Sequence, residues 1–122
     1  LLTGIGSSRL IEFPLGDNVV VSRVSDRQAF AHSRRLREDT GIDVGGSSGA
    51  TLAACARFLA TVSHDVTVLC LCADGADRYE STIFSDRWLA DHGVVITDAD
   101  LLPAVGYLPA EIGHHGSIIP FP

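Results

Sequence analysis

Gly45-Gly46-Ser47-Ser48-Gly49 leads directly into Ala50-Thr51-Leu52-Ala53-Ala54-Cys55-Ala56-Arg57-Phe58-Leu59-Ala60, a run with one charged residue. This pattern predicts a helix over 50–60 that is apolar nearly all round and therefore buried on several sides. Glycine allows close backbone approach to a ligand, and a helix start offers unpaired N–H groups and a positive dipole end. Ser47 and Ser48 are thus candidate ligands of a polar ring atom or an anion. A serine-capped helix after a tight turn explains the same residues.

The flanking sequence predicts alternating strands and helices. Strands are expected at 19–21, 66–72 and 94–97, and helices at 27–39 and 79–91, with Ser85-Asp86 as a possible start of a second short helix. Ser25 is a candidate N-cap of the first helix and Gly41 its C-terminal stop. The continuous apolar run Val66–Cys72 suits a parallel strand covered on both faces. The chain is therefore expected to be α/β, with the 50–60 helix packed between a parallel sheet and other protein.

Composition restricts the partners. The net charge is −6 and no basic stripe is present, which argues against nucleic acid. No apolar run reaches the roughly 18–20 residues of a membrane helix, so no membrane partner is expected. All nine basic residues are arginine, and both lysine and methionine are absent. We therefore expect the chain to be a piece of a longer protein.

The cysteines point to a reducing compartment. Cys55, Cys70 and Cys72 form an odd set with no evident disulfide framework, and no second Cys or His pair lies at zinc-ligand spacing. We expect reduced core thiols, no metal site and a cytoplasmic location.

One alternative function is serine hydrolysis. Gly45-Gly46-Ser47-Ser48-Gly49 fits the Gly-x-Ser-x-Gly pattern, with Ser47 as nucleophile. A triad could be completed by His92 or His114 together with Asp91 or Asp74. The context is poor, because a nucleophile elbow needs a firm strand directly before it and only Ile42-Asp43-Val44 is available.

Four motifs resemble the pyridoxal-phosphate enzymes of the cysteine synthase and cystathionine β-synthase family. They are Gly4-Ile5-Gly6, Gly45–Ala53, the segment Asp74-Gly75-Ala76-Asp77-Arg78-Tyr79-Glu80-Ser81-Thr82, and Phe84-Ser85-Asp86-Arg87-Trp88-Leu89. They occur in family order and together cover residues 4 to about 90. The family normally has Gly where Ala76 stands. Gly4–Arg9 and Asp77-Arg78-Tyr79 are most similar to the branch that makes a 2,3-diaminopropionate precursor for siderophores and antibiotics by joining an activated serine to glutamate.

The resemblance implies a fold and an activity. The fold would be the three-layer, tryptophan-synthase-β-like fold type II, incomplete in this chain, with 1–100 as the C-terminal part of the catalytic domain and 101–122 as an irregular tail. The activity would be β-replacement on O-acetylserine, O-phosphoserine or serine through an aminoacrylate intermediate. The cofactor would be pyridoxal 5′-phosphate. The expected partners are the N-terminal remainder of the same enzyme, small amino-acid substrates and a second copy in a homodimer.

The resemblance also assigns residues. Ser47 would place its hydroxyl on the pyridine nitrogen of the cofactor. Because the hydroxyl is neutral, it leaves that nitrogen largely unprotonated. Ser48 would lie beside Ser47 in the cofactor site. Gly4 and Gly6 would pass the cofactor's face, although an ordinary turn explains them as well. Arg9 is a candidate substrate ligand or a solvated surface residue. No catalytic residue is expected in this chain, since the Schiff-base lysine would lie upstream. A lysine-free regulatory or scaffold fragment is a third possible function.

Overall fold

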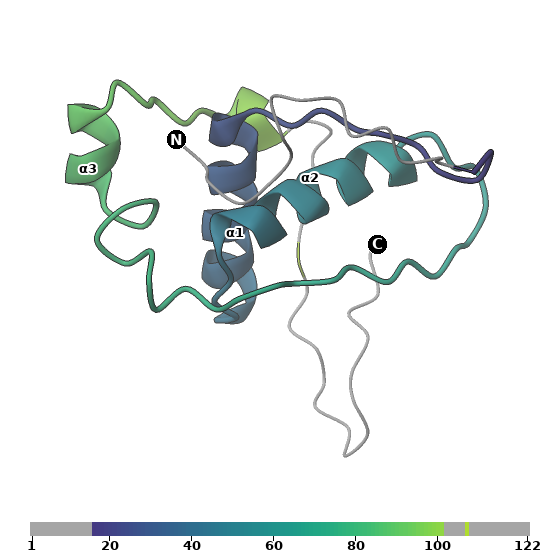
Figure 1. Ribbon diagram of the computed structural model, residues 1–122, viewed down its shortest axis with the longest axis horizontal. Coiled ribbons are helices and arrows are strands. Elements are labelled where there is room, and N and C mark those ends of the chain that lie inside the picture. The colour runs from purple at the N-terminus through teal and green to yellow at the C-terminus, as the bar shows by residue number, and fades with distance from the viewer. Residues whose placement is uncertain (1–15, 102–106, 108–122) are drawn as a thin grey trace, which may run out of the picture.

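Helices and extended segments make up the part of the chain that the computed structural model describes, residues 16–101 and 107. Three α-helices, α1 (Asp26–Thr40), α2 (Gly46–Leu59) and α3 (Asp86–Asp91), are followed by a 3₁₀ turn, η1 (Asp98–Leu101). Figure 1 shows α1 and α2 crossing at the centre of the molecule, with α3 to one side. No helix among these residues is both long and apolar enough to cross a membrane.

The caps of α1 explain why it begins and ends where the sequence predicts. The Ser25 side chain accepts a hydrogen bond from the Gln28 N–H, and the Gln28 side chain accepts one from the Ser25 N–H, which is a capping box. Gly41 ends the helix with φ +73°. The buried face contains Ala29, Phe30, Ser33 and Leu36.

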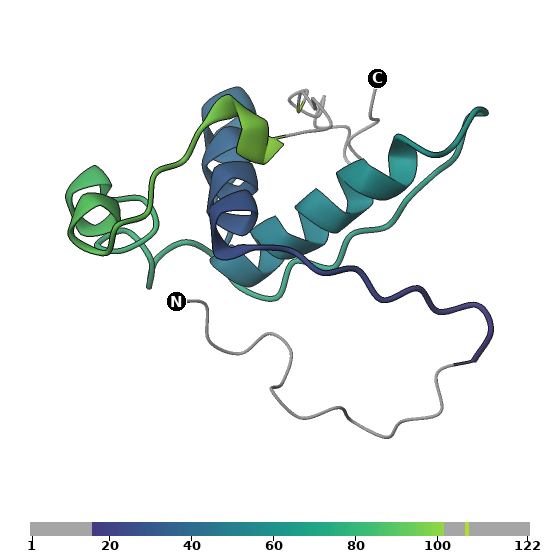
Figure 2. The same ribbon diagram turned by 90° about the horizontal axis from the view of Figure 1, so that it is seen from above.

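A glycine allows α1 and α2 to touch (Figure 2). A Cβ on Gly49 would lie 2.0 Å from the Ala29 carbonyl oxygen and 2.3 Å from Ser33 Oγ. Only glycine fits this crossing without displacement of α1. The predicted helix 50–60 is confirmed, and its first turn includes the serines that were expected just before it.

Two apolar clusters contain residues of α1. One combines Ala29 and Phe30 of α1 with Ile83 and Leu89. The other combines Leu36, Val44, Leu52 and Tyr107. These clusters fix α1 as the central helix, in contact with both α2 and the later loops.

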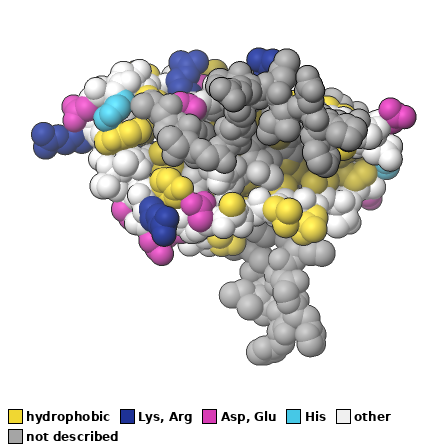
Figure 3. All heavy atoms as spheres, viewed as in Figure 1, with side chains coloured by type: hydrophobic (Ala, Val, Ile, Leu, Met, Phe, Trp, Pro, Cys, Tyr) yellow, Lys and Arg dark blue, Asp and Glu magenta, His cyan; other side chains and the backbone are white. Residues whose placement is uncertain are grey.

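The predicted strands are wrong for the described residues. Segments 19–21, 66–72 and 94–97 are extended but belong to no strand ladder. Figures 1 and 2 show the first two running in the same direction, opposite to α2, as a parallel sheet would require. A strand needs a neighbour for its backbone groups, and the described residues supply none. Apolar side chains consequently remain at the surface (Figure 3): Val20 is 90% exposed and Leu69 83%.

The region predicted as helix 79–91 divides into two parts. Residues 77–84 form consecutive turns, and only Asp86–Asp91 is helical, capped by the Ser85 side chain. The possible start at Ser85-Asp86 is thus confirmed. Ala76 is buried and has no positive φ, so the alanine in place of the family's glycine causes no backbone strain here.

Candidate functional site

The candidate site lies at the N-terminal end of α2, where two other elements hold Gly45. The Ser33 hydroxyl of α1 donates a hydrogen bond to the Gly45 carbonyl over 3.0 Å. The Gly45 N–H donates to the Asp74 carbonyl over 3.1 Å. A Cβ on Gly45 would lie 2.3 Å from Asp74 Oδ1 and 2.6 Å from a ring carbon of Tyr79. The glycine therefore permits the 74–79 loop to contact the start of the helix.

Ser47 lies half-buried in the first turn of α2, between this loop and a pocket. Its Oγ is 3.5 Å from Asp74 Oδ1. The pocket has a volume of about 390 Å³ and is lined by part of the 20–24 segment, the first residue of α1 and one face of α2: Val20, Ser22, Val24, Asp26, Ser47, Ala50, Thr51 and Ala54. Ser47 is thus the serine of the predicted pair that reaches a cavity.

Asp74 and Tyr79 form the strongest side-chain contact of the site. The Tyr79 hydroxyl donates to Asp74 Oδ2 over 2.7 Å. This hydrogen bond, together with a smaller effect of burial, raises the pKa of Tyr79 above its ordinary value. Tyr79 therefore keeps its proton at neutral pH and acts as a donor to the carboxylate.

Arg37 of α1 holds the loop that contains Tyr79. Its guanidinium pairs with Glu80 and with Asp43, and it lies 3.6 Å from the centre of the Phe84 ring. The hydrogen bond to Glu80 is the main reason that the pKa of Arg37 is raised. A charge on the central helix thereby fixes the turns next to the candidate site.

Ser48 is placed differently from Ser47. It is 1% exposed and does not line the pocket. Among the described residues its Oγ is the one buried side-chain oxygen or nitrogen without a hydrogen-bond partner. An unsatisfied buried hydroxyl costs roughly 1–3 kcal/mol, so a partner from outside these residues is expected. The predicted role of Ser48 beside the cofactor stays a prediction.

The other predicted site residues, Gly4, Gly6 and Arg9, lie outside the described residues. Their proposed roles at the cofactor's face and at the substrate therefore stay predictions. The same holds for the tail beyond residue 107.

The triad expected for a hydrolase is not assembled in the described part of the chain. The hydrogen-bonding neighbour of Ser47 is a carboxylate and not an imidazole. His92 instead shares a hydrogen bond between its Nδ1 and the Trp88 carbonyl and stacks on the Trp88 ring. His114 lies outside the described residues.

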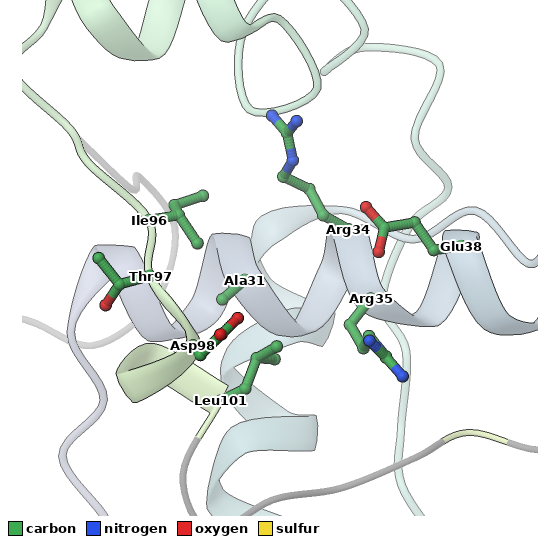
Figure 4. Close-up of a pocket in the computed structure, with 8 residues that line it drawn as sticks. All are labelled: Ala31, Arg34, Arg35, Glu38, Ile96, Thr97, Asp98 and Leu101. Carbon is green, nitrogen blue, oxygen red and sulfur yellow. The ribbon is translucent and has the colours of Figure 1, made fainter.

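A second pocket, of about 190 Å³, is lined by one face of α1 and by residues between 96 and 101 (Figure 4). Arg34 and Arg35 are among its lining residues. Both charges are already paired, Arg34 with Asp86 and Arg35 with Asp39. Figure 4 shows the Arg34 side chain directed away from Asp98 and Leu101. Neither Arg34 nor Arg35 therefore offers an unpaired positive charge to this pocket.

Sequence reasoning missed a buried polar pair. His32 Nδ1 lies 2.6 Å from the Tyr107 hydroxyl, and the Tyr107 N–H donates to Asp39 over 3.0 Å. Burial, reinforced by the charge of Arg57, lowers the pKa of His32 to about 4. The signal in the sequence was His32 on the buried stripe of α1. Nothing in the pattern identified a tyrosine 75 residues away as its partner.

The Cys70 thiol also ionises less readily than its position in an extended segment indicates. Burial and a hydrogen bond with Cys55 raise the pKa of the Cys70 thiol to about 12. Of the expected core thiols, Cys55 is buried and Cys70 partly so, whereas Cys72 is exposed. Cys72 was therefore wrongly predicted to be a core residue.

Comparison with known proteins points to one kind of enzyme. No protein-family model matches the chain. The chain is 40% identical over 90 residues to the N-(2-amino-2-carboxyethyl)-L-glutamate synthase of Ralstonia nicotianae, and 41% identical over 93 residues to the synthase of the same name from Cupriavidus metallidurans. Each match covers 73% of this chain and 27% of the relative, so the chain spans about a quarter of the length of these synthases.

Proposed function

We propose that this chain supplies the ring-nitrogen end of the cofactor site in a pyridoxal-phosphate-dependent synthase, which joins a serine-derived three-carbon unit to the amino group of glutamate. The single observation that carries the proposal is the match to two synthases whose names describe glutamate bearing a 2-amino-2-carboxyethyl group. The motifs that resemble the family lie within the same chain, and the branch they indicated agrees with these names.

The geometry of Ser47 supports the fit of the cofactor. A ring with one basic nitrogen needs a pocket of moderate size and a single polar group at one end. Ser47 offers a hydroxyl at the wall of a 390 Å³ pocket, in which Val20, Val24, Ala50 and Ala54 supply apolar lining and Ser22, Asp26 and Thr51 supply polar groups. Gly45 has no side chain, so the 74–79 loop can lie against the start of α2, close to the Ser47 hydroxyl. When bound, the cofactor would withdraw electrons from the substrate's α-carbon.

The roles proposed for this chain's own residues are binding and orientation. Ser47 would meet the ring nitrogen, and α2 would hold it rigidly because its first turn is tied to α1 through Ser33. The covalent lysine would come from the remainder of the enzyme, since this chain contains no lysine. The segments 19–21 and 66–72 would join a parallel sheet with strands of that remainder, which would complete the three-layer fold and allow a homodimer to form.

The test is a substitution of Ser47 in the complete enzyme, assayed for N-(2-amino-2-carboxyethyl)-glutamate formed from glutamate and each of O-phosphoserine, O-acetylserine and serine. Ser47→Ala should slow product formation about ten- to a hundredfold, the effect of losing one hydrogen bond of roughly 1.5–3 kcal/mol to a developing charge. Ser63→Ala, at an exposed position that does not line the pocket, is the matched control.

Three results would contradict the proposal. Product at the parent rate from Ser47→Ala would remove the role of Ser47. An esterase activity that needs no cofactor and is lost in Ser47→Ala would favour the hydrolase. No product from any serine donor, with tight binding to a partner enzyme, would favour the regulatory fragment.

A further inference from the structure

Arg57, in the last turn of α2, joins that helix to the extended segment before α1. One guanidinium nitrogen, Nη1, donates a hydrogen bond to the Arg23 carbonyl over 2.6 Å and lies 3.4 Å from Ser22 Oγ. The other, Nη2, donates to the Gln28 side-chain oxygen over 2.9 Å. That oxygen also accepts the Ser25 N–H in the capping box of α1. Arg57 is thus bonded both to the extended segment and to the start of α1.

The extended segment and α2 form two walls of the pocket that Ser47 lines. The segment contributes alternate residues, which share one side of an extended chain: Val20, Ser22 and Val24. From α2, Ala54 lines the pocket seven residues after Ser47, which places the two on the same face of the helix. Arg57 follows Ala54 by three residues and does not line the pocket. Its bonds therefore join the two walls from beyond one end of the pocket.

Packing fixes only one end of the wall that the extended segment provides. Val24 packs against the apolar cluster around Phe30, whereas Val20 is 90% exposed. The bonds of Arg57 reach the segment between these two valines, at Ser22 and the Arg23 carbonyl. A guanidinium holds several donors in a rigid planar arrangement, so it fixes both the distance and the angle of what it binds. The distance of this wall from α2 thus depends on one side chain.

We propose that Arg57 is a positioning residue that sets the width of the pocket and thereby the affinity of the site for the cofactor's ring. This inference rests on the proposed function. A pocket binds a flat ring tightly only when its walls stay at contact distance, because a gap below 1 Å already forfeits much of the dispersion attraction. Ser47 is held separately, since the first turn of α2 is tied to α1 through Ser33. Arg57 therefore acts on cofactor affinity and not on the chemistry of the bound cofactor.

The experiment measures the affinity of the complete enzyme for pyridoxal phosphate. Cofactor-free enzyme is titrated with pyridoxal phosphate and binding is followed by absorbance, at a temperature at which the variants are folded. Arg57→Ala should raise the dissociation constant about tenfold, the effect of losing one hydrogen bond from a charged donor. Product formation at saturating cofactor should stay at the parent rate. A loss of rate that saturating cofactor does not restore would contradict a role limited to affinity.

Two further variants make the result specific. Arg57→Lys keeps the charge but lacks the planar fork, so its dissociation constant should lie between those of the parent and of Arg57→Ala. Arg87→Ala removes an exposed arginine of α3 that does not line the pocket, and it should bind the cofactor as the parent does. A parent-like dissociation constant in both Arg57 variants would overturn the inference, as would an equal increase in Arg87→Ala. Where Arg57→Ala does not fold, Arg57→Lys alone decides in the same way.

The same measurements separate this inference from the proposed function. If the complete parent enzyme binds no pyridoxal phosphate, or if Ser47→Ala forms product at the parent rate, the proposed function fails. If the parent binds the cofactor and Ser47→Ala is slow while both Arg57 variants bind the cofactor as tightly as the parent, only the positioning role of Arg57 is wrong.

Discussion

Single residues at the helix crossing decide how close the elements of the site come together. Gly49 lies where any side chain would overlap the Ala29 carbonyl and the Ser33 hydroxyl. Ser33 in turn donates to the Gly45 carbonyl, so a clash at position 49 would disturb the bond that fixes the first turn of α2. The position of the Ser47 hydroxyl therefore depends on a glycine two residues away.

We expect Gly49→Ala to destabilise the complete protein by about 1–3 kcal/mol, the range for overpacking a close contact, even though alanine favours a helix more than glycine does. Thermal or denaturant unfolding measures the change. Gly75→Ala is the control, because a Cβ there would meet no atom within 4 Å. Equal stability of the two variants would mean that the crossing can open without cost.

At the scale of elements, α1 begins with the most complete local signal in the chain. The Ser25 and Gln28 side chains satisfy each other's backbone N–H groups, and Asp26 places a negative charge in the first turn. α2 has no side-chain cap bond at Gly45 and is held instead by contacts with α1 and the 74–79 loop. The first helix is therefore specified locally, and the second by its neighbours.

Ser25→Ala should lower the free energy of unfolding by about 1 kcal/mol, because one of the helix's first N–H groups loses its acceptor. The midpoint of chemical unfolding in the complete protein reports this change. Ser81→Ala replaces a serine at an exposed turn position and should have little effect. A loss from Ser25→Ala no larger than that from Ser81→Ala would show that the cap contributes nothing measurable.

At the scale of the whole molecule, the extended segments leave apolar side chains at the surface of the described residues. Leu69 and Leu71 are 83% and 79% exposed in a run that the sequence identifies as a buried strand. Exposed apolar runs with unpaired backbone groups are surfaces for strand pairing. The relatives are nearly four times as long as the part that this chain matches, so under the proposed function the remainder of the enzyme would supply the pairing strands.

We expect the backbone amides of 66–72 to exchange with deuterium rapidly in the isolated chain and slowly in the complete enzyme, since a central strand opens only with the protein as a whole. Hydrogen exchange followed by mass spectrometry makes the comparison. The amides of α1 provide the internal control, because their hydrogen bonds lie within the helix. Slow exchange of 66–72 in the isolated chain would mean that it pairs without the remainder.

The sequence by itself determined α1 and α2, because their signals are local. Caps, periodicity and glycine stops act within a few residues, so α1 and α2 could be predicted from Ser25, the buried stripe of α1 and the run after Gly49. Ser47 could be singled out for the same reason, since a glycine- and serine-rich turn before a helix is a local pattern. The limit of this method is visible at 66–72, where the hydrophobic pattern predicts a strand but cannot provide the neighbour it needs.

The tertiary structure alone decided which distant groups meet. Asp74 reaches Ser47, 27 residues earlier, because Gly45 admits the loop and Arg37 holds it. The tertiary structure likewise brings Tyr107 to His32, and it keeps Ser48 out of the pocket that Ser47 lines. Each of these outcomes depends on how helices and loops pack in three dimensions, and sequence spacing contains no information on such contacts when the residues lie on different elements.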